Sequence, residues 1–150
     1  MTQKLNVLFL CTGNACRSQM AEGWARHLKG KTIEPYSAGV IATRLDPRAV
    51  QVMAEAGVDI SAQRSKRMED LRDRAFDCVV TLCDHARESC PVFPGSAGAM
   101  HVGFDDPPTL TAFAASEDAA LAQYRRVRDE IRAFIESLPG SLAGLRRKAT

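Results

Sequence analysis

The chain has 150 residues and a formal net charge of +2, and it is 45% hydrophobic and 25% charged. This length is typical of one domain that buries a core without help from disulfides or metals. Its 20 basic residues are spread along the chain, which argues against a nucleic-acid partner. No apolar run reaches the roughly 18 residues of a membrane span, and the start shows no signal-peptide pattern. Five cysteines are an odd number, which fits free thiols in a reducing compartment better than closed disulfides. We therefore expect a cytoplasmic monomer.

The first half of the chain predicts strands that alternate with helices. Residues 5–10 form an apolar run typical of a parallel strand that is covered on both faces. A helix is expected next, because apolar residues recur at spacings of three and four: Met20, Ala21, Trp24, Ala25 and Leu28. Residues 32–39 predict a second strand. In residues 45–57, Asp46 is expected to cap a helix and Pro47 to take its first position.

The second half predicts two further strands and a long helix. The strands are expected at residues 76–83 and 99–104, and the helix from about residue 116 to residue 138. This order predicts a single three-layer α/β domain, residues 1–138, with a four-stranded parallel sheet flanked by helices. Residues 139–150 are expected to form a C-terminal tail. The ligand site of such a sheet lies outside the carboxyl ends of its strands.

A cysteine-containing loop at the first strand end is the main chemical signal. Cys11 ends the strand, and Arg17 and Ser18 follow where the first helix is expected to begin. A loop of this length aims backbone N–H groups inward, and the positive end of the helix adds to the field, so the loop can hold a tetrahedral oxyanion and a thiolate. Arg17 can bind two oxyanion oxygens, and Ser18 can donate to the sulfur. Gly13 and Asn14 are expected to take positive φ. The alternative interpretation is a buried structural cysteine.

Several motifs together resemble one known family. They are "VLFLCTGNACRSQMAEGW", "YSAG", "VVTLC", "CDHARESCP" and "GFDDP". In this order, from about residue 4 to residue 138, they resemble the thioredoxin-coupled arsenate reductases that share the low molecular weight protein tyrosine phosphatase fold. The resemblance implies an oxidoreductase that serves arsenic detoxification, with arsenate as substrate and thioredoxin as reductant.

The resemblance also implies a relay of three cysteines. Cys11 attacks arsenate that is held by Arg17 and the loop, and Asp106 protonates the departing oxygen. Cys83 then attacks Cys11, and arsenite leaves as two electrons pass to arsenic. Cys90 attacks Cys83, and thioredoxin reduces the resulting redox-active disulfide. Chemistry independently favours this division, because reduction of As(V) to As(III) needs two sulfurs that become bonded and a third that frees the first.

Further residues are implied by the same comparison. The expected oxyanion-binding residues are Cys11, Thr12, Gly13, Asn14, Ala15, Cys16 and Arg17. Ser18 and Ser37 are expected to support the loop. The aspartate before proline, Asp106, is preferred over Asp105 as the acid. Some reductases of this kind bind potassium through the loop asparagine, a helix glutamate and a later aspartate. Glu22 matches, but Lys66 stands where the aspartate would be, and we expect no cofactor and no metal site.

Two other functions remain open from the sequence. A low molecular weight protein tyrosine phosphatase would use the same Cys11, Arg17 and Asp106. Such phosphatases usually carry aromatic residues after the Asp-Pro pair, whereas Pro108 and Thr109 follow here, and a phosphotyrosine ring would have little to stack on. A non-catalytic thiol redox sensor would keep the loop but turn over no oxyanion.

Overall fold

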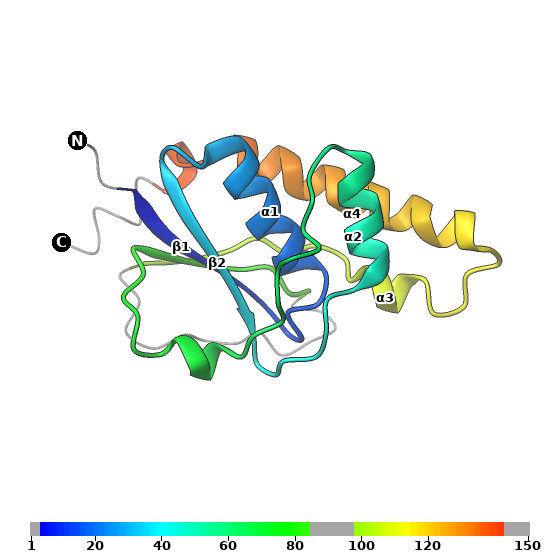
Figure 1. The fold of residues 1–150 in the computed structure, drawn as a ribbon, viewed down its shortest axis with the longest axis horizontal. Helices are drawn as coiled ribbons and strands as arrows, with labels where there is room; N and C mark the ends of the chain where they lie inside the picture. The colour runs from blue at the N-terminus through cyan, green and yellow to red at the C-terminus, as the bar shows by residue number, and fades with distance from the viewer. Residues whose placement is uncertain (1–3, 85–97, 143–150) are drawn as a thin grey trace.

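A sheet of four parallel strands forms the centre of the structure, in the order β2-β1-β3-β4 (Figure 1). This computed structural model describes residues 4–84 and 98–142. The strands are β1 (Leu5–Cys11), β2 (Ile33–Gly39), β3 (Cys78–Thr81) and β4 (Ala99–His101). β2, β3 and β4 lie within segments expected to be strands, and β1 extends one residue beyond its expected segment. The predicted four-stranded parallel α/β architecture is confirmed.

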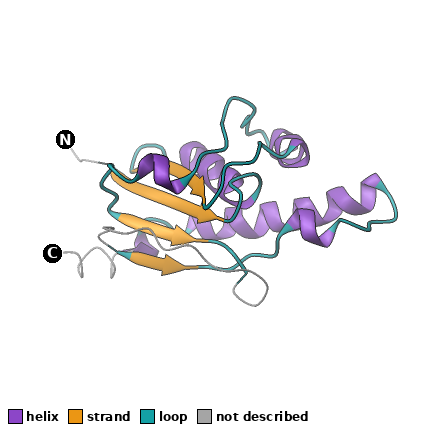
Figure 2. Cartoon of the chain, turned by 90° about the horizontal axis from the view of Figure 1, so that it is seen from below, coloured by secondary structure: helices purple, strands orange, loops and turns teal. Residues whose placement is uncertain are grey.

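Helices cover one face of this sheet, and a thinner layer covers the other (Figures 1 and 2). The helices are α1 (Arg17–Lys29), α2 (Pro47–Glu55), α3 (Pro107–Leu110) and α4 (Glu117–Glu136). The larger core lies between the sheet and α1, α2 and α4. Trp24 of α1 is buried there, and its indole N–H donates to the carbonyl of Arg128 at 3.2 Å. A smaller core on the opposite face packs under the 3-10 turn η1 (Met68–Leu71).

The helix boundaries agree with the signals in the sequence. Asp46 caps α2, accepting a hydrogen bond from the backbone N–H of Arg48 at 2.9 Å, and Pro47 takes the first helical position. Gly57 follows the helix with a φ of +87°. Pro35 lies in β2, an edge strand of the sheet, where its missing N–H is tolerated.

The first helix is more deeply buried than its periodicity predicts. The apolar face is buried as expected, but every residue from 17 to 25 is buried, including four polar ones: Arg17, Ser18, Gln19 and Glu22. A surface helix normally keeps such side chains in water. Their burial therefore requires polar partners inside the protein, and these partners build the candidate site.

The C-terminal part begins with residues that belong to the core. Leu142, in the 3-10 turn η2 (Gly140–Leu142), is fully buried within the segment expected as a tail. The remainder of that segment, 143–150, lies outside the described residues.

The short helix α3 after Asp106 was not expected from the sequence. No helix within the described ranges is long and apolar enough to cross a membrane.

Candidate active site

The loop between β1 and α1 turns its carbonyl groups outward. The carbonyl of Thr12 accepts from the N–H of Ile41 at 3.3 Å, and the carbonyl of Ala15 accepts from the N–H of Asp46 at 2.9 Å. The remaining acceptor bonds come from side chains and from the first turn of α1: Thr43 to Gly13 (2.9 Å), Ser65 to Gly13 (3.1 Å), Gln19 to Asn14 (3.0 Å) and Met20 to Cys16 (2.9 Å). All five carbonyls from residue 12 to residue 16 are thus bonded to their surroundings.

This arrangement decides where the backbone donors of the loop point. In a planar trans peptide, the N–H lies opposite the C=O of the preceding residue. Outward carbonyls at residues 12–16 therefore turn the N–H groups of residues 13–17 toward the concave side of the loop. Successive inward N–H groups at the start of a 13-residue helix form a cradle that suits a tetrahedral oxyanion. The expected oxyanion-binding residues lie together in this cradle.

Cys11 lies at the end of β1 with its sulfur next to Ser18. Its Sγ is 2.9 Å from Ser18 Oγ, and Ser18 Oγ accepts a hydrogen bond of 2.7 Å from the side-chain amide of Asn14. Asn14 has a φ of 49°, the positive value expected for it. Gly13 was expected to share this conformation, and that prediction is wrong, because Asn14 is the loop residue that turns the chain. An asparagine tolerates this region when its side chain is bonded locally.

Arg17 is buried beneath the mouth of the loop. Its guanidinium donates to the carbonyl of Phe104 at 3.1 Å and lies 3.5 Å from the carbonyl of Leu82. It also lies 3.4 Å from the carboxylate of Asp106. Leu82 follows β3 and Phe104 follows β4, so Arg17, which comes after the loop from β1, contacts the segments that follow these two strands. A guanidinium fixed in this way is ready to bind an anion in the cradle.

The structure separates the two adjacent aspartates. Asp105 is directed to the surface, where it pairs with Arg126 of α4 at 3.0 Å. Asp106 faces the loop through Arg17, and its other oxygen accepts a hydrogen bond of 2.7 Å from Thr109. Of the two carboxyl groups, Asp106 is therefore the one that contacts Arg17 at the end of the loop.

Cys83 lies close to this site, two residues beyond the end of β3. The neighbouring N–H of Leu82 donates to Leu10 of β1 at 2.8 Å, which keeps this segment beside β1 as it approaches Cys11. Cys83 is fully buried and its sulfur is in a disulfide, while the three other described cysteines are free. Cys90 lies outside the described residues.

The two free cysteines besides Cys11 are in different surroundings. Cys78 is buried within β3. Cys16 ends the loop, and burial, together with the nearby carboxylates of Asp46 and Asp106, raises the pKa of its thiol well above the ordinary value. A protonated, buried thiol is a poor nucleophile. This environment favours Cys11 over Cys16 for attack on an anion.

Glu22 lies beside the loop and is already neutralised by the chain. Its carboxylate accepts from Ser37 at 2.6 Å and pairs with Arg26 at 2.7 Å and with the Lys66 ammonium at 3.8 Å. Burial lowers the pKa of Lys66, and the charge of Glu22 opposes that shift. A potassium ion does not fit a carboxylate with two attached cations. Ser37, expected to support the loop, donates its hydroxyl hydrogen bond to Glu22 of this cluster.

Gly39 at the end of β2 allows the loop to pass close to this strand. A methyl group there would lie 2.7 Å from the backbone nitrogen of Asn14 and 2.7 Å from the carbonyl oxygen of Thr12. We predict that Gly39→Ala displaces the loop and lowers the free energy of unfolding by about 1 to 3 kcal/mol, with weaker phosphate binding. Gly140→Ala is the matched control, since its new methyl group would meet nothing within 4 Å. Equal melting temperatures and phosphate affinities for the two variants would contradict this prediction.

Comparison with known proteins places this geometry in a family. The profile of the family described as low molecular weight phosphotyrosine protein phosphatase matches residues 6–148. An arsenate reductase of Bacillus subtilis is 48% identical over 126 residues, which are 83% of this chain and 88% of that protein. The chain belongs to the arsenate reductases of this family.

Solved structures agree with this assignment. An arsenate reductase in its phosphate-binding state superposes with a TM-score of 0.75 at 31% identity, covering 94% of this chain and all of the other. A thioredoxin-dependent arsenate reductase of Corynebacterium glutamicum has a TM-score of 0.62 at 28% identity. That match covers 93% of this chain and 64% of the other. The family resemblance predicted from the sequence is confirmed.

Some residues at the site could not be selected from the sequence. Three such residues carry no reactive group: Gln19, Gln63 and Gly39. Each of them contacts a segment that is distant from it in the sequence. Gln19 binds the carbonyl of Arg64, 45 positions away, at 2.9 Å. Its position directly after the Arg17-Ser18 pair is the one local signal, and Gln19 is not among the apolar residues that recur along this helix.

Proposed function

We propose that this protein reduces arsenate to arsenite through a three-cysteine relay, with thioredoxin as the electron donor. One observation carries the proposal: a buried thiol, Cys11, lies in an anion cradle, and a second buried cysteine, Cys83, which is in a disulfide, lies two residues beyond the end of the neighbouring strand β3. A hydrolytic phosphatase needs the first of these groups but not the second. We further propose that the enzyme acts as a cytoplasmic monomer, where thioredoxin keeps thiols reduced.

In the first step, arsenate occupies the cradle and Cys11 attacks its arsenic. The inward N–H groups of residues 13–17 and the guanidinium of Arg17 bind the oxyanion oxygens. A bond forms between Cys11 Sγ and arsenic, and one oxygen leaves. Asp106 lies 3.4 Å from Arg17, and this position beside the loop supports Asp106, in its protonated form, as the donor of the proton that converts this oxygen to water.

In the second and third steps, the electrons pass from sulfur to arsenic. Cys83 attacks Cys11 Sγ and forms a disulfide, while the electron pair of the sulfur–arsenic bond moves to arsenic and arsenite is released. Cys90 then attacks Cys83, so that Cys11 returns to the thiolate and a Cys83–Cys90 disulfide remains for thioredoxin. The disulfide at Cys83 supports a part for this cysteine in the thiol–disulfide steps. The thioredoxin-dependent relative supports the choice of reductant.

Asp106→Asn tests the assigned acid. The amide keeps the shape of the carboxyl group but has no proton of suitable acidity to give, so we expect kcat to fall by roughly 10²-fold or more. Asp105→Asn is the matched control, because Asp105 pairs with Arg126 at the surface. The measurement is arsenate-dependent turnover. A wild-type rate for Asp106→Asn, or an equal loss in both variants, would contradict the assignment.

The whole proposal is tested by coupled NADPH oxidation. The protein is mixed with thioredoxin, thioredoxin reductase and NADPH, and arsenate is added; a parallel sample receives an aryl phosphate without the coupling proteins. We expect NADPH consumption that requires arsenate and thioredoxin together. No consumption combined with release of the phenol would support a phosphatase, and inactivity in both assays would support a thiol sensor.

A further inference from the structure

A line of hydrogen bonds runs from the surface of α1 to the sulfur of Cys11. Arg26 donates to the side-chain oxygen of Gln63 at 3.1 Å, and the amide of Gln63 donates to the side-chain oxygen of Gln19 at 2.8 Å. Gln19 donates to the side-chain oxygen of Asn14 at 3.0 Å. Asn14 donates to Ser18 at 2.7 Å, and Ser18 Oγ lies 2.9 Å from Cys11 Sγ. The three inner polar residues, Asn14, Ser18 and Gln19, are fully buried.

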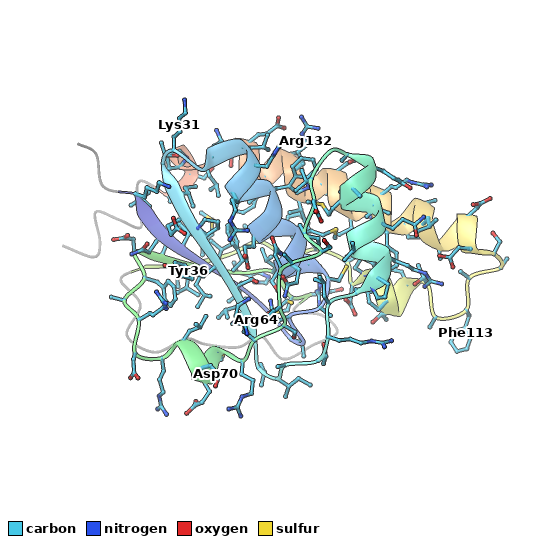
Figure 3. The ribbon with its side chains drawn as sticks, viewed as in Figure 1. Lys31, Tyr36, Arg64, Asp70, Phe113 and Arg132 are labelled. Carbon is cyan, nitrogen blue, oxygen red and sulfur yellow. The ribbon has the colours of Figure 1, made fainter. Side chains whose placement is uncertain are left out.

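The direction of this line is fixed at its outer end. A guanidinium donates hydrogen bonds and accepts none, so the oxygen of Gln63 must face Arg26 and its NH₂ group must face Gln19. The oxygen of Gln19 therefore faces Gln63, and its NH₂ group faces the loop. There it also donates to the carbonyl of Arg64 at 2.9 Å, in the segment labelled in Figure 3 beside the carboxyl end of β2. Every amide along the line has one permitted orientation.

The same reasoning decides the direction of the last bond. The oxygen of Asn14 accepts from Gln19 and from the backbone N–H of Lys66 at 2.7 Å, so its NH₂ group must face Ser18. Ser18 Oγ accepts that bond and keeps its own hydrogen for Cys11. If the amide of Asn14 were flipped, its oxygen would face Ser18 and could take this hydrogen away from the sulfur.

We propose that Gln19 is a positioning residue that fixes the orientation of Asn14, so that the Ser18 hydroxyl donates to Cys11 and stabilises its thiolate. This role rests on the proposed function of Cys11 as a nucleophile. Gln19 contacts neither the sulfur nor the bound anion, and it acts through Asn14 and Ser18. Lys66 is a second, independent anchor of Asn14, so the loss of Gln19 weakens the orientation without abolishing it.

The charged groups around Cys11 are independent of this line. Arg17 and Asp106 face the loop as an ion pair, and Cys16 with the nearby Asp46 lies at its far end. Among the described residues, the hydrogen bonds of Gln19 outside its own helix go to Asn14, Arg64 and Gln63. Gln19→Met therefore leaves these charges in place and adds none, whereas Gln19→Glu adds a carboxylate that itself disfavours a nearby thiolate. A change in the ionisation of Cys11 in Gln19→Met would then report the hydrogen bond from Ser18.

The test measures the pH dependence of Cys11 alkylation in Gln19→Met and Gln19→Glu. The reduced protein, without any oxyanion, is treated with iodoacetamide over a range of pH, and mass spectrometry quantifies modification at Cys11. Gln19→Met removes the donor, and Gln19→Glu turns a carboxylate toward the oxygen of Asn14. We expect the pH of half-maximal reactivity to rise in both, and the rate at neutral pH to fall by about tenfold in Gln19→Glu and by less in Gln19→Met. Gln51→Glu, an exposed change on α2, is the control and should match the wild type.

The outcomes separate this proposal from a purely structural role. Unchanged pH profiles in Gln19 variants with native circular dichroism would overturn it, even if their melting temperatures fell. If Gln19→Glu does not fold, Gln19→Met decides the question in the same way. The assay contains no arsenate, so a shifted profile would stand even if the coupled NADPH assay showed no reductase activity.

Discussion

Cys11→Ser is expected to abolish arsenate reduction, with kcat lower by roughly 10⁴-fold or more. A serine hydroxyl is not ionised near neutral pH, and it cannot take part in the disulfide that supplies electrons to arsenic. The cradle is built from backbone groups and from Arg17, so its capacity to bind oxyanions should remain. Calorimetric titration with phosphate should therefore show binding close to wild type, while the coupled NADPH assay shows no turnover.

Cys78→Ala provides the control for this result. Cys78 is as deeply buried as Cys11, but it lies in β3 and belongs to the core. Its loss should lower stability modestly and leave turnover intact. Comparable loss of turnover in Cys78→Ala, or residual turnover in Cys11→Ser above one hundredth of the wild-type rate, would argue against Cys11 as the nucleophile.

Cys83→Ser is expected to stop the relay after the first chemical step. Cys11 can still attack arsenate, but no second sulfur is available to accept the bond from Cys11, so arsenite is not released. We expect background turnover in the coupled assay, with oxyanion binding unchanged. Under the same conditions Cys90→Ser should release one arsenite per enzyme and then stop, with a Cys11–Cys83 disulfide that mass spectrometry can identify.

The contrast between these two variants is the informative result. Both variants lack steady-state turnover, but Cys83→Ser stops before arsenite is released, whereas Cys90→Ser stops one step later, after one arsenite per enzyme. Cys83→Ser that releases stoichiometric arsenite would reverse the order of the two cysteines. Wild-type turnover in either variant would show that its cysteine lies outside the relay.

Residues with a local signature could be predicted from the sequence. The spacing of Cys11, Arg17 and Ser18 depends only on a strand, a short loop and a helix that follow one another. Asp46 could be predicted as a cap for the same reason, since capping is a local event. In each case the structure places the residue as expected.

The remaining parts of the site depend on contacts between distant segments. Gln19 is buried because residues near Arg64 cover a helix face that periodicity leaves in water, and the pattern of one helix holds no information about its neighbours. Gly39 is needed because the loop between β1 and α1 passes within 2.7 Å of where a methyl group would lie. Asp105 and Asp106 are adjacent and chemically alike; the family resemblance favours Asp106, but their different partners, Arg126 and Arg17, are seen only in the structure.

An anaerobic single-turnover experiment tests the proposed relay most directly. Fully reduced enzyme is mixed with one equivalent of arsenate in the absence of thioredoxin, and arsenite and disulfides are quantified after quenching with acid. The proposed mechanism predicts about one arsenite per enzyme, together with a Cys83–Cys90 disulfide and a free Cys11 thiol. It would be contradicted by an enzyme that forms no arsenite, or by one that forms arsenite while Cys83 and Cys90 both remain reduced.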